Sequence, residues 1–324
     1  MKRRLLGAAV AVSVAALVAT PAASQEAYPS KLVRLIVPFP AAGPLDVMAR
    51  LYAQRLGERW GKPVIVENRA GATGTIGTDA VAKAAPDGYT LLFTVDLPIV
   101  MAPTLMKPPY DPKADLLPVA AMSETMNMLV AHPTTGLNTL PELVAAAKAR
   151  PGSLTFASAG NASPGHLCVE MVKSSAGIDL THVPYKGAAP AMVAALAGEV
   201  SMFCGPLMTG LPHVRSGKLK ALGVTGTQRS PLAPEIAPLS ATFSGLAFVN
   251  WYAVFAPRGT PPAVVTVVRE ALRKTYDDPG VTERLSAVGM DPVWLEGAQV
   301  SAAIDRDLAR WSAVVKAANI KPGP

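Results

Sequence analysis

The chain has 324 residues, with 30 lysines and arginines against 23 aspartates and glutamates, and only 6% of its residues are aromatic. Because the positive balance is small and the basic residues are scattered, the composition argues against a nucleic-acid-binding protein. The 31 prolines exclude a long coiled coil, and the length exceeds what one core usually holds, so two lobes are expected.

The first 24 residues have the pattern of a secretory signal peptide. A basic start at residues 1–4 precedes an apolar run at residues 5–18, which is too short to span a membrane. Small residues lead to a predicted cleavage between Ser24 and Gln25. Removing three basic residues with this segment leaves 27 basic and 23 acidic residues, a formal net charge of +4. We therefore expect a soluble, periplasmic protein whose weak positive charge is compatible with an anionic ligand.

Strands and helices alternate after the signal peptide, which is typical of an α/β protein. In the helix expected over 46–60, apolar side chains recur every four residues from Met48 to Trp60, and Gly61 follows where a helix-ending glycine belongs. This alternation favours parallel strands with right-handed crossovers. The first unit has expected strands at 32–37, 64–66 and 89–94 and expected helices at 46–60 and 75–85.

A second unit repeats the alternation and is followed by a helical tail. Its expected strands are 128–131, 154–157, 182–185, 200–203 and 218–224, and its expected helices are 140–150, 166–176 and 189–197. A Pro-rich border at 230–245 leads to a strand at 251–255 and to helices at 262–276, 279–287 and 298–318. We predict lobe 1 from residues 25–126 plus 250–324 and lobe 2 from residues 127–249. A cleft should lie between them, with a hinge of two or more crossings.

Two strand-to-helix loops, one in each unit, are built from small residues. Small side chains let a ligand approach the backbone, and the first turn of a helix offers unpaired N–H groups and a partial positive charge. Together they predict an anion site without Lys or Arg. Either loop alone is at least as well explained as an ordinary capped turn, but two alike loops favour binding in a shared cleft. The loop residues predicted to bind are Phe39, Pro40, Ala41, Ala42, Gly43 and Asp46 in the first unit and Ser158, Asn161, Ala162 and Ser163 in the second.

Further residues complete the predicted ligand site: Thr73, Thr94, Asp96, Cys204 and Trp251. Thr73 belongs to a glycine loop at 68–77 with the spacing G-x-x-G-x-x-G, a poor match to a nucleotide fingerprint, so no cofactor is expected. For Trp251 and the adjacent Tyr252, core packing of an apolar strand is the favoured alternative to flanking a ligand.

A secreted hydrolase or metal enzyme is the second function considered, and it would use His166, Glu170 and Cys204. The sequence contains no G-x-S-x-G elbow, and its four histidines have no recognised zinc spacing, so no metal is expected. His166 and Glu170, four residues apart, are better explained as a helix-surface contact. Cys168 and Cys204 permit a disulfide after export, but two small buried hydrophobic residues are favoured. A third hypothesis is an orphan sensory binding protein that signals to a membrane kinase.

Several motifs, in order along nearly the whole mature chain, resemble the Bug proteins, the TctC-like receptors of tripartite tricarboxylate transporters. The motifs are Tyr28-Pro29, Ile36-Val37-Pro38-Phe39-Pro40, Glu67-Asn68-Arg69, Pro86-Asp87-Gly88-Tyr89-Thr90, Pro151-Gly152, the stretch 158–167, His182-Val183-Pro184-Tyr185-Lys186-Gly187, Trp251, Ala256-Pro257 and Trp311. The resemblance implies a type II periplasmic binding protein fold without enzymatic activity. It also implies a monomer that binds a small carboxylate in the loops 39–43 and 158–163 and hands it to the membrane subunits of a transporter.

The sequence departs from that family at three positions. Ala42 and Ala162 stand where the family usually has glycine, and Cys204 stands where it often has an acid. Each added methyl group narrows the approach to the backbone, and the missing acid removes a partner for an amino group. We therefore predict an aromatic or aliphatic mono- or dicarboxylate in preference to an amino acid.

Overall fold

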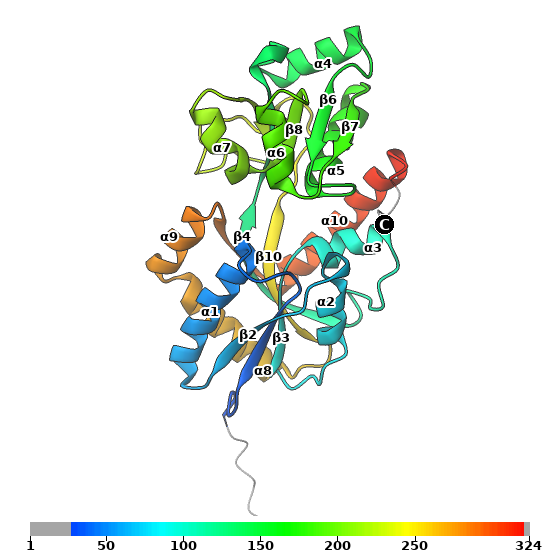
Figure 1. Ribbon diagram of the computed structural model, residues 1–324. Coiled ribbons are helices and arrows are strands. Elements are labelled where there is room, and N and C mark those ends of the chain that lie inside the picture. The colour runs from blue at the N-terminus through cyan, green and yellow to red at the C-terminus, as the bar shows by residue number, and fades with distance from the viewer. Residues whose placement is uncertain (1–26, 321–324) are drawn as a thin grey trace, which may run out of the picture.

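The computed structural model describes residues 27–320, whose strands form two separate sheets (Figure 1). We call the six-stranded sheet and its helices lobe 1, and the five-stranded sheet and its helices lobe 2. The predicted signal peptide lies outside the described residues. Among the residues that are described, no helix combines the length and the apolar character needed to cross a membrane.

The sheet of lobe 1 has the order β11-β4-β10-β3-β1-β2. Its strands are β1 (Val33–Val37), β2 (Val64–Asn68), β3 (Thr90–Val95), β4 (Leu116–Thr125), β10 (Asn250–Pro257) and β11 (Asp291–Glu296). As predicted from the alternation, β1 is parallel to both β2 and β3. Strand β10 is antiparallel to β3 and to β4 and joins the two halves of the sheet.

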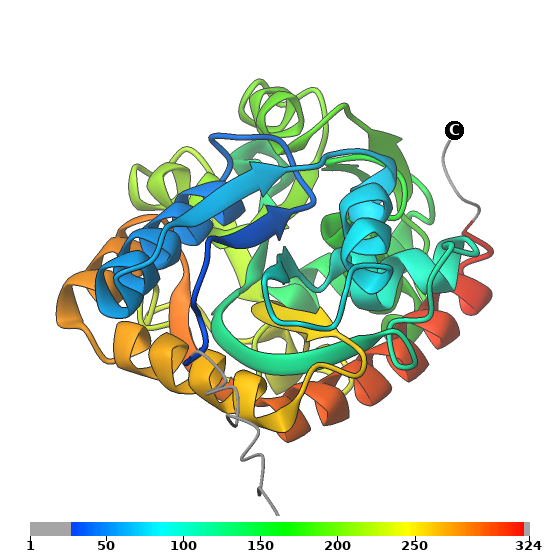
Figure 2. The ribbon, with the colours of Figure 1, turned by 90° about the horizontal axis from the view of Figure 1, so that it is seen from below.

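Helices cover both faces of this sheet (Figure 2). They are α1 (Pro44–Trp60), α2 (Thr75–Ala82), α3 (Ala102–Leu105), α8 (Pro262–Tyr276), α9 (Pro279–Ala287) and α10 (Gly297–Ala317). Alternate residues of β1 point to opposite faces: Leu35 packs in one core with Met48 and Tyr52 of α1, whereas Ile36 belongs to the other core with Ile304 of α10. Full burial of such side chains contributes about 1.5–3 kcal/mol each, which holds the helices on the sheet.

The sheet of lobe 2 has the order β7-β6-β8-β5-β9. Its strands are β5 (Asn127–Ala131), β6 (Thr155–Ser158), β7 (Thr181–Pro184), β8 (Met202–Pro206) and β9 (Lys220–Val224). Its helices are α4 (Leu140–Ala149), α5 (Pro164–Ala176), α6 (Ala188–Leu196) and α7 (Leu207–Arg215). Strand β6 is parallel to β7 and β8, whereas β5 is antiparallel to β8 and β9. In both lobes one antiparallel strand, β10 or β5, lies between three parallel strands and a further strand, and lobe 1 has β11 in addition.

The chain crosses between the sheets twice. It passes from β4 to β5 near residue 126, and it returns through residues 225–249 from β9 to β10. At the crossings, Asn127 Nδ2 donates to Asn250 Oδ1 over 2.9 Å, and Asn250 Nδ2 donates to both carboxyl oxygens of Asp96. The predicted two-lobed α/β architecture with a hinge of two crossings is thus confirmed. We keep 25–126 with 250–324, and 127–249, as the proposed lobe boundaries.

Four of the labelled helices and strands were not expected from the sequence: α3, β4, α7 and β11. Each contains a proline, at Pro103, Pro118, Pro212 and Pro292. Pairing of β11 with β4 stops at Ala120, so Pro118 lies beyond it, and Pro292 lies on an edge strand. Edge positions tolerate the missing N–H group of proline, which is why these strands form despite their sequence.

Candidate functional site

The two predicted loops have the same construction in both lobes. An alanine in the left-handed region, Ala42 (φ 66°) or Ala162 (φ 58°), precedes the N-cap residue of the helix that follows. The N-cap is Gly43 for α1 and Ser163 for α5, and a proline follows in each case. The left-handed conformation costs an alanine about 1–2 kcal/mol, which explains why glycine is usual at these positions in the family that the chain resembles.

The third residue of each helix accepts a hydrogen bond from the left-handed alanine. In lobe 1 the Ala42 N–H donates to Asp46 Oδ2 over 2.9 Å, and in lobe 2 the Ala162 N–H donates to His166 Nδ1 over 3.0 Å. The side chain of Ser163 also accepts from the His166 N–H at 3.3 Å. Both loops are thus fixed to the first turn of their helix, as in a capping box.

Asp46 is buried and carries the support of the first loop. Arg50 Nε donates to its Oδ2 at 2.9 Å, and Asn68 Nδ2 donates to its Oδ1 at 2.9 Å and to the carbonyl of Phe39 at 3.1 Å. Burial acts to raise the pKa of the Asp46 carboxyl, but the hydrogen bonds from Arg50, Ala42 and Asn68 outweigh it and lower the pKa. The charged carboxylate therefore already occupies the positive end of α1.

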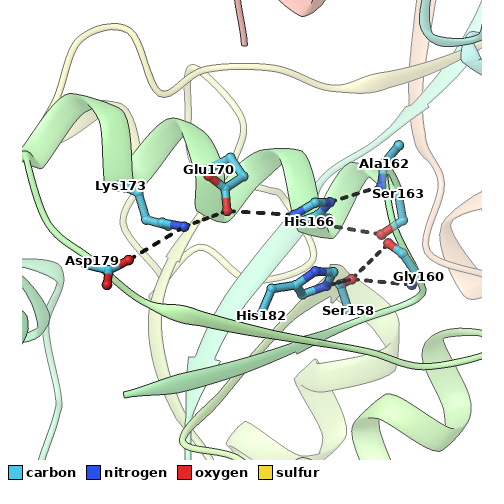
Figure 3. A network of polar contacts seen from close by, with 9 residues as sticks. All are labelled: Ser158, Gly160, Ala162, Ser163, His166, Glu170, Lys173, Asp179 and His182. Carbon is cyan, nitrogen blue, oxygen red and sulfur yellow. Dashed lines mark hydrogen bonds and ion pairs between the residues drawn. The ribbon is translucent and has the colours of Figure 1, made fainter. Parts of the chain in front are cut away.

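The second loop is supported by two stacked histidine rings (Figure 3). The rings of His166 and His182 lie 3.9 Å apart at an angle of 9°. His182 Nε2 contacts Ser158 Oγ at 2.7 Å, and that hydroxyl donates to the Gly160 carbonyl at 3.0 Å. Because the hydroxyl hydrogen is used by Gly160, His182 must donate from Nε2. Burial, together with the neighbouring His166, lowers the pKa of His182 to about 4, so this ring is neutral at physiological pH.

A pocket of about 230 Å³ lies between the lobes. Lobe 1 lines it with residues that include Val95, Leu97 and Tyr252, and lobe 2 with residues that include Ser163, Gly165 and Cys204. Most of this lining is apolar, and it contains no lysine, arginine, aspartate or glutamate among residues 27–320. A ligand in this pocket would meet the N-terminus of α5 at one end and apolar side chains along its body.

The predicted site residues divide into those at the pocket and those away from it. Ser163 and Cys204 line the pocket. The rest of the second loop adjoins it, with Ser158 buried and Asn161 exposed. Within the described chain, the pocket lining does not include the first loop: residues 40–42 are exposed, and the Phe39 ring lies against Gly74. Joint binding of one carboxylate by both loops therefore stays a prediction.

Four residues predicted at the ligand have other surroundings. Thr94 and Asp96 are fully buried, and Asp96 is bonded to Asn250, while Thr73 is exposed in the turn before α2. Burial raises the pKa of Asp96 well above its ordinary value, against the hydrogen bonds from Asn250. Trp251 is a core residue, and its indole N–H donates to Asp307 at 3.1 Å.

The pocket also contains residues that the sequence reasoning did not select. Asn127 and Asn250 line it at the two crossings, and Val95, Leu97 and Tyr252 line it from lobe 1. Adjacent residues of a strand face opposite sides, so only one of Trp251 and Tyr252 can face the pocket. That alternation was the available signal for Tyr252. The sequence contained no signal for Asn127 and Asn250, because only the fold brings the two crossings beside the pocket.

The residues of the hydrolase or metal-enzyme hypothesis are His166, Glu170 and Cys204, and the structure gives their surroundings. Cys168 and Cys204 are free and buried, as favoured from the sequence, and burial with the adjacent Cys168 raises the pKa of the Cys204 thiol. His166 Nε2 lies 3.7 Å from Glu170 Oε1, so the two residues form the expected helix contact. Among residues 27–320, no three His, Cys, Asp or Glu side chains gather as a metal site.

Comparison with known proteins identifies the family. Residues 48–320 match the profile described as the tripartite tricarboxylate transporter family receptor, TctC. The chain belongs to the TctC family. BugT of Bordetella pertussis is 37% identical to this TctC member over 303 residues, 92% of each chain.

Solved structures confirm the expected periplasmic binding protein fold. The periplasmic binding protein BugD is 32% identical, with a TM-score of 0.72 over 91% of this chain and 99% of BugD. Rpa4515 of R. palustris, solved with adipate, is 30% identical, with a TM-score of 0.76 over 91% of this chain and 100% of that one. MatC of Rhodopseudomonas palustris, solved with malate, is 29% identical, with a TM-score of 0.71 over 89% and 100%. This TctC member is therefore a solute-binding receptor by family.

Proposed function

We propose that this TctC-family protein captures a small carboxylate between its lobes and delivers it unchanged to the membrane subunits of a tripartite transporter. Contacts that the ligand makes to both lobes would favour the closed arrangement over the open one. The observation that carries the proposal is the N-terminus of α5, which opens with Ser163 and Gly165 on the pocket between the lobes.

The two helix N-termini differ in how well each can bind an anion. At α1 the buried Asp46 carboxylate, paired with Arg50 at 2.9 Å, already supplies negative charge. At α5 the corresponding side chain is His166, and the first turn contains no acid. Because α5 opens with Pro164 and the His166 N–H is bonded to Ser163, the Gly165 N–H and the partial positive charge of α5 remain for a ligand carboxylate. We place the carboxylate at the second loop, with the first loop closing on it from lobe 1.

The walls of the pocket favour a ligand with an apolar body. Val95, Leu97 and Tyr252 face Cys204 across a space of about 230 Å³. An ammonium group would find no acidic side chain there, because the middle residue of β8 is Cys204 and Asp96 is fully buried against Asn250. Aliphatic and aromatic acids are therefore favoured over amino acids. The adipate and malate present in solved relatives support a carboxylate as the ligand class.

Calorimetry of the mature protein against mono-, di- and tricarboxylates, aromatic acids and amino acids tests the ligand class. We expect binding of aliphatic or aromatic acids, and no heat from aspartate or glutamate. Heat of binding from aspartate or glutamate, without any from adipate or benzoate, would contradict the proposed class.

The variant Ser163→Asp tests where the carboxylate binds. It adds a negative charge at the proposed seat, so affinity should fall by more than tenfold, a difference of about 1.4 kcal/mol or more. The matched control is Ser175→Asp, which adds the same charge at an exposed position near the other end of α5. Equal affinities in the two variants would move the seat away from α5.

Export, oligomeric state and the absence of covalent chemistry are tested separately. Mass spectrometry of the periplasmic fraction should find a mature protein beginning at Gln25, and light scattering should find a monomer. A bound acid should be recovered chemically unchanged after prolonged incubation. Recovery of a hydrolysed ester or amide would favour the hydrolase hypothesis.

A further inference from the structure

Asp46 and His166 occupy matching positions in the two loops but are acceptors of different chemistry. Each accepts the N–H of a left-handed alanine, at 2.9 Å from Ala42 and at 3.0 Å from Ala162. A carboxylate with a lowered pKa keeps its acceptor oxygen throughout the neutral range. An imidazole keeps its acceptor nitrogen only while that nitrogen is unprotonated.

The hydrogen bonds fix the tautomer of His166. Because Nδ1 accepts from Ala162, the single proton of the neutral ring belongs on Nε2, which faces Glu170 Oε1 at 3.7 Å (Figure 3). A second proton on Nδ1 would point at the Ala162 N–H and break that hydrogen bond. The loop would then lose the contact that holds it to the first turn of α5.

His182 holds the same loop from the other side. Its ring stacks on His166 and on Phe156, and its Nε2 reaches Ser158, the first residue of the loop. Two imidazolium rings 3.9 Å apart would repel each other, so the neutral His182 leaves room for at most one charge in the stack.

We propose that His166 is a positioning residue for the carboxylate-binding loop 158–163, and that protonation within the His166–His182 stack releases this loop and weakens ligand binding. The predicted loss of ligand affinity rests on the proposed function, whereas the predicted release of the loop does not. His166 acts through the backbone of Ala162 and not by touching the ligand.

Charged and titratable groups surround the stack, and the charged ones act in both directions. The groups near it are Glu170 and Lys173 on α5, Asp179 before β7, Cys204 on β8 and Arg310 on α10, which shares a pocket with Glu170 and Lys173. Glu170 favours a proton on His166, but Lys173 pairs with Glu170 at 2.8 Å and competes for the same oxygen. Hydrogen bonds from His166 and Lys173 lower the pKa of Glu170, against burial, so this acid stays charged across the range in which histidine titrates.

The ligand-free protein provides the first test, by NMR of a 15N-labelled sample between pH 8 and pH 5. At pH 8, Nδ1 of His166 should have the shift of an unprotonated ring nitrogen, and the Ala162 amide should exchange slowly with solvent. As the pH falls, the Ala162 amide resonance should move and its protection should be lost with the midpoint of the His166 titration. Protonated Nδ1 at pH 8, or an Ala162 amide that is indifferent to that midpoint, would overturn the proposal.

Ligand affinity provides the second test, with adipate and benzoate as probes. Between pH 8 and pH 6 their carboxyl groups remain ionised, since a carboxyl pKa is near 4.3. Affinity should fall by up to about tenfold per pH unit below the histidine midpoint. His166→Asn keeps an acceptor for Ala162 that does not titrate, so its affinity at pH 8 should be lower but its pH dependence should be flat.

Two other histidine variants serve as comparisons. His182→Gln keeps a donor for Ser158 but removes the stacked ring, so the loss of Ala162 protection at low pH should persist. His213→Asn changes a histidine of α7 and should retain the wild-type pH dependence. A pH dependence that persists in His166→Asn would refute the role of His166. If neither probe binds at any pH, the proposed ligand class fails, and the NMR result still decides the inference.

Discussion

The variant Gly165→Ala should be among the most damaging single-methyl changes in this protein. Gly165 lies in the first turn of α5, directly against the backbone of β8. A Cβ atom there would lie 2.8 Å from the carbonyl carbon of Cys204 and nearer still to its oxygen, whereas ordinary contacts begin at 3.4 Å. Helix and strand would have to separate by at least 0.6 Å, the difference between these distances.

The cost follows from what must move. Backbone atoms cannot rotate away as a flexible side chain can, so we expect the upper end of the overpacking range, about 3 kcal/mol. Displacing α5 also moves Ser163, so affinity for adipate or benzoate should fall together with stability.

Urea unfolding followed by circular dichroism measures the effect. The matched control is Gly57→Ala in α1, where the nearest atoms to an added Cβ lie at 3.5 and 3.8 Å. Helical glycine-to-alanine changes with enough room stabilise by about 0.5–1 kcal/mol. If the two variants had the same free energy of unfolding, the direct contact of Gly165 with the backbone of β8 would be refuted.

Three further variants test the buried polar groups. Asp46→Asn should reduce the loss of stability at acid pH. A carboxyl with a lowered pKa stabilises the fold above its unfolded value of 3.8, and this stabilisation is lost as the pH falls through the folded value. An unchanged dependence of the free energy of unfolding on acid pH, measured with urea, would contradict this. Trp251→Phe removes the donor to Asp307 and should cost about 1–3 kcal/mol, and a loss below about 0.5 kcal/mol in the same unfolding assay would contradict this. Burial raises the pKa of Asp96, so the contribution of this group to the stability of the wild type falls as the pH rises beyond 3.8. The free energy of unfolding of Asp96→Asn, relative to that of the wild type, should therefore be higher at pH 8 than at pH 5. A difference between the two proteins that does not change with pH would exclude this.

Most of the fold could be predicted because its helices and buried strands have clear periodicity. The apolar stripe from Met48 to Trp60 predicted α1, and alternating strands and helices predicted the parallel units. Prolines concealed β4 and α7, since local preference disfavours both elements and only packing between distant segments stabilises them. The position of β10 between β3 and β4 is likewise set by long-range pairing.

The two loops of the site could be predicted from the sequence, but the contacts that support them could not. Small residues before a helix identified both loops, and Asp46 was selected with them. The role of His166 as the counterpart of Asp46 was not visible, because it depends on a backbone bond from Ala162. His182 joins the stack only through the pairing of β7 with β6, which brings it beside Ser158.

The insertion of β10 has a consequence for how the newly made chain folds. All five strands of lobe 2 lie between residues 127 and 224, so that sheet is available as soon as this continuous segment has been synthesised. The first sheet, although begun earlier, lacks β10 and β11 until residues 250–296 exist, and its β3 and β4 have unfilled edges until then. Lobe 1 is therefore the last part to be completed, and the newly made chain remains incompletely folded until nearly its whole length has been synthesised.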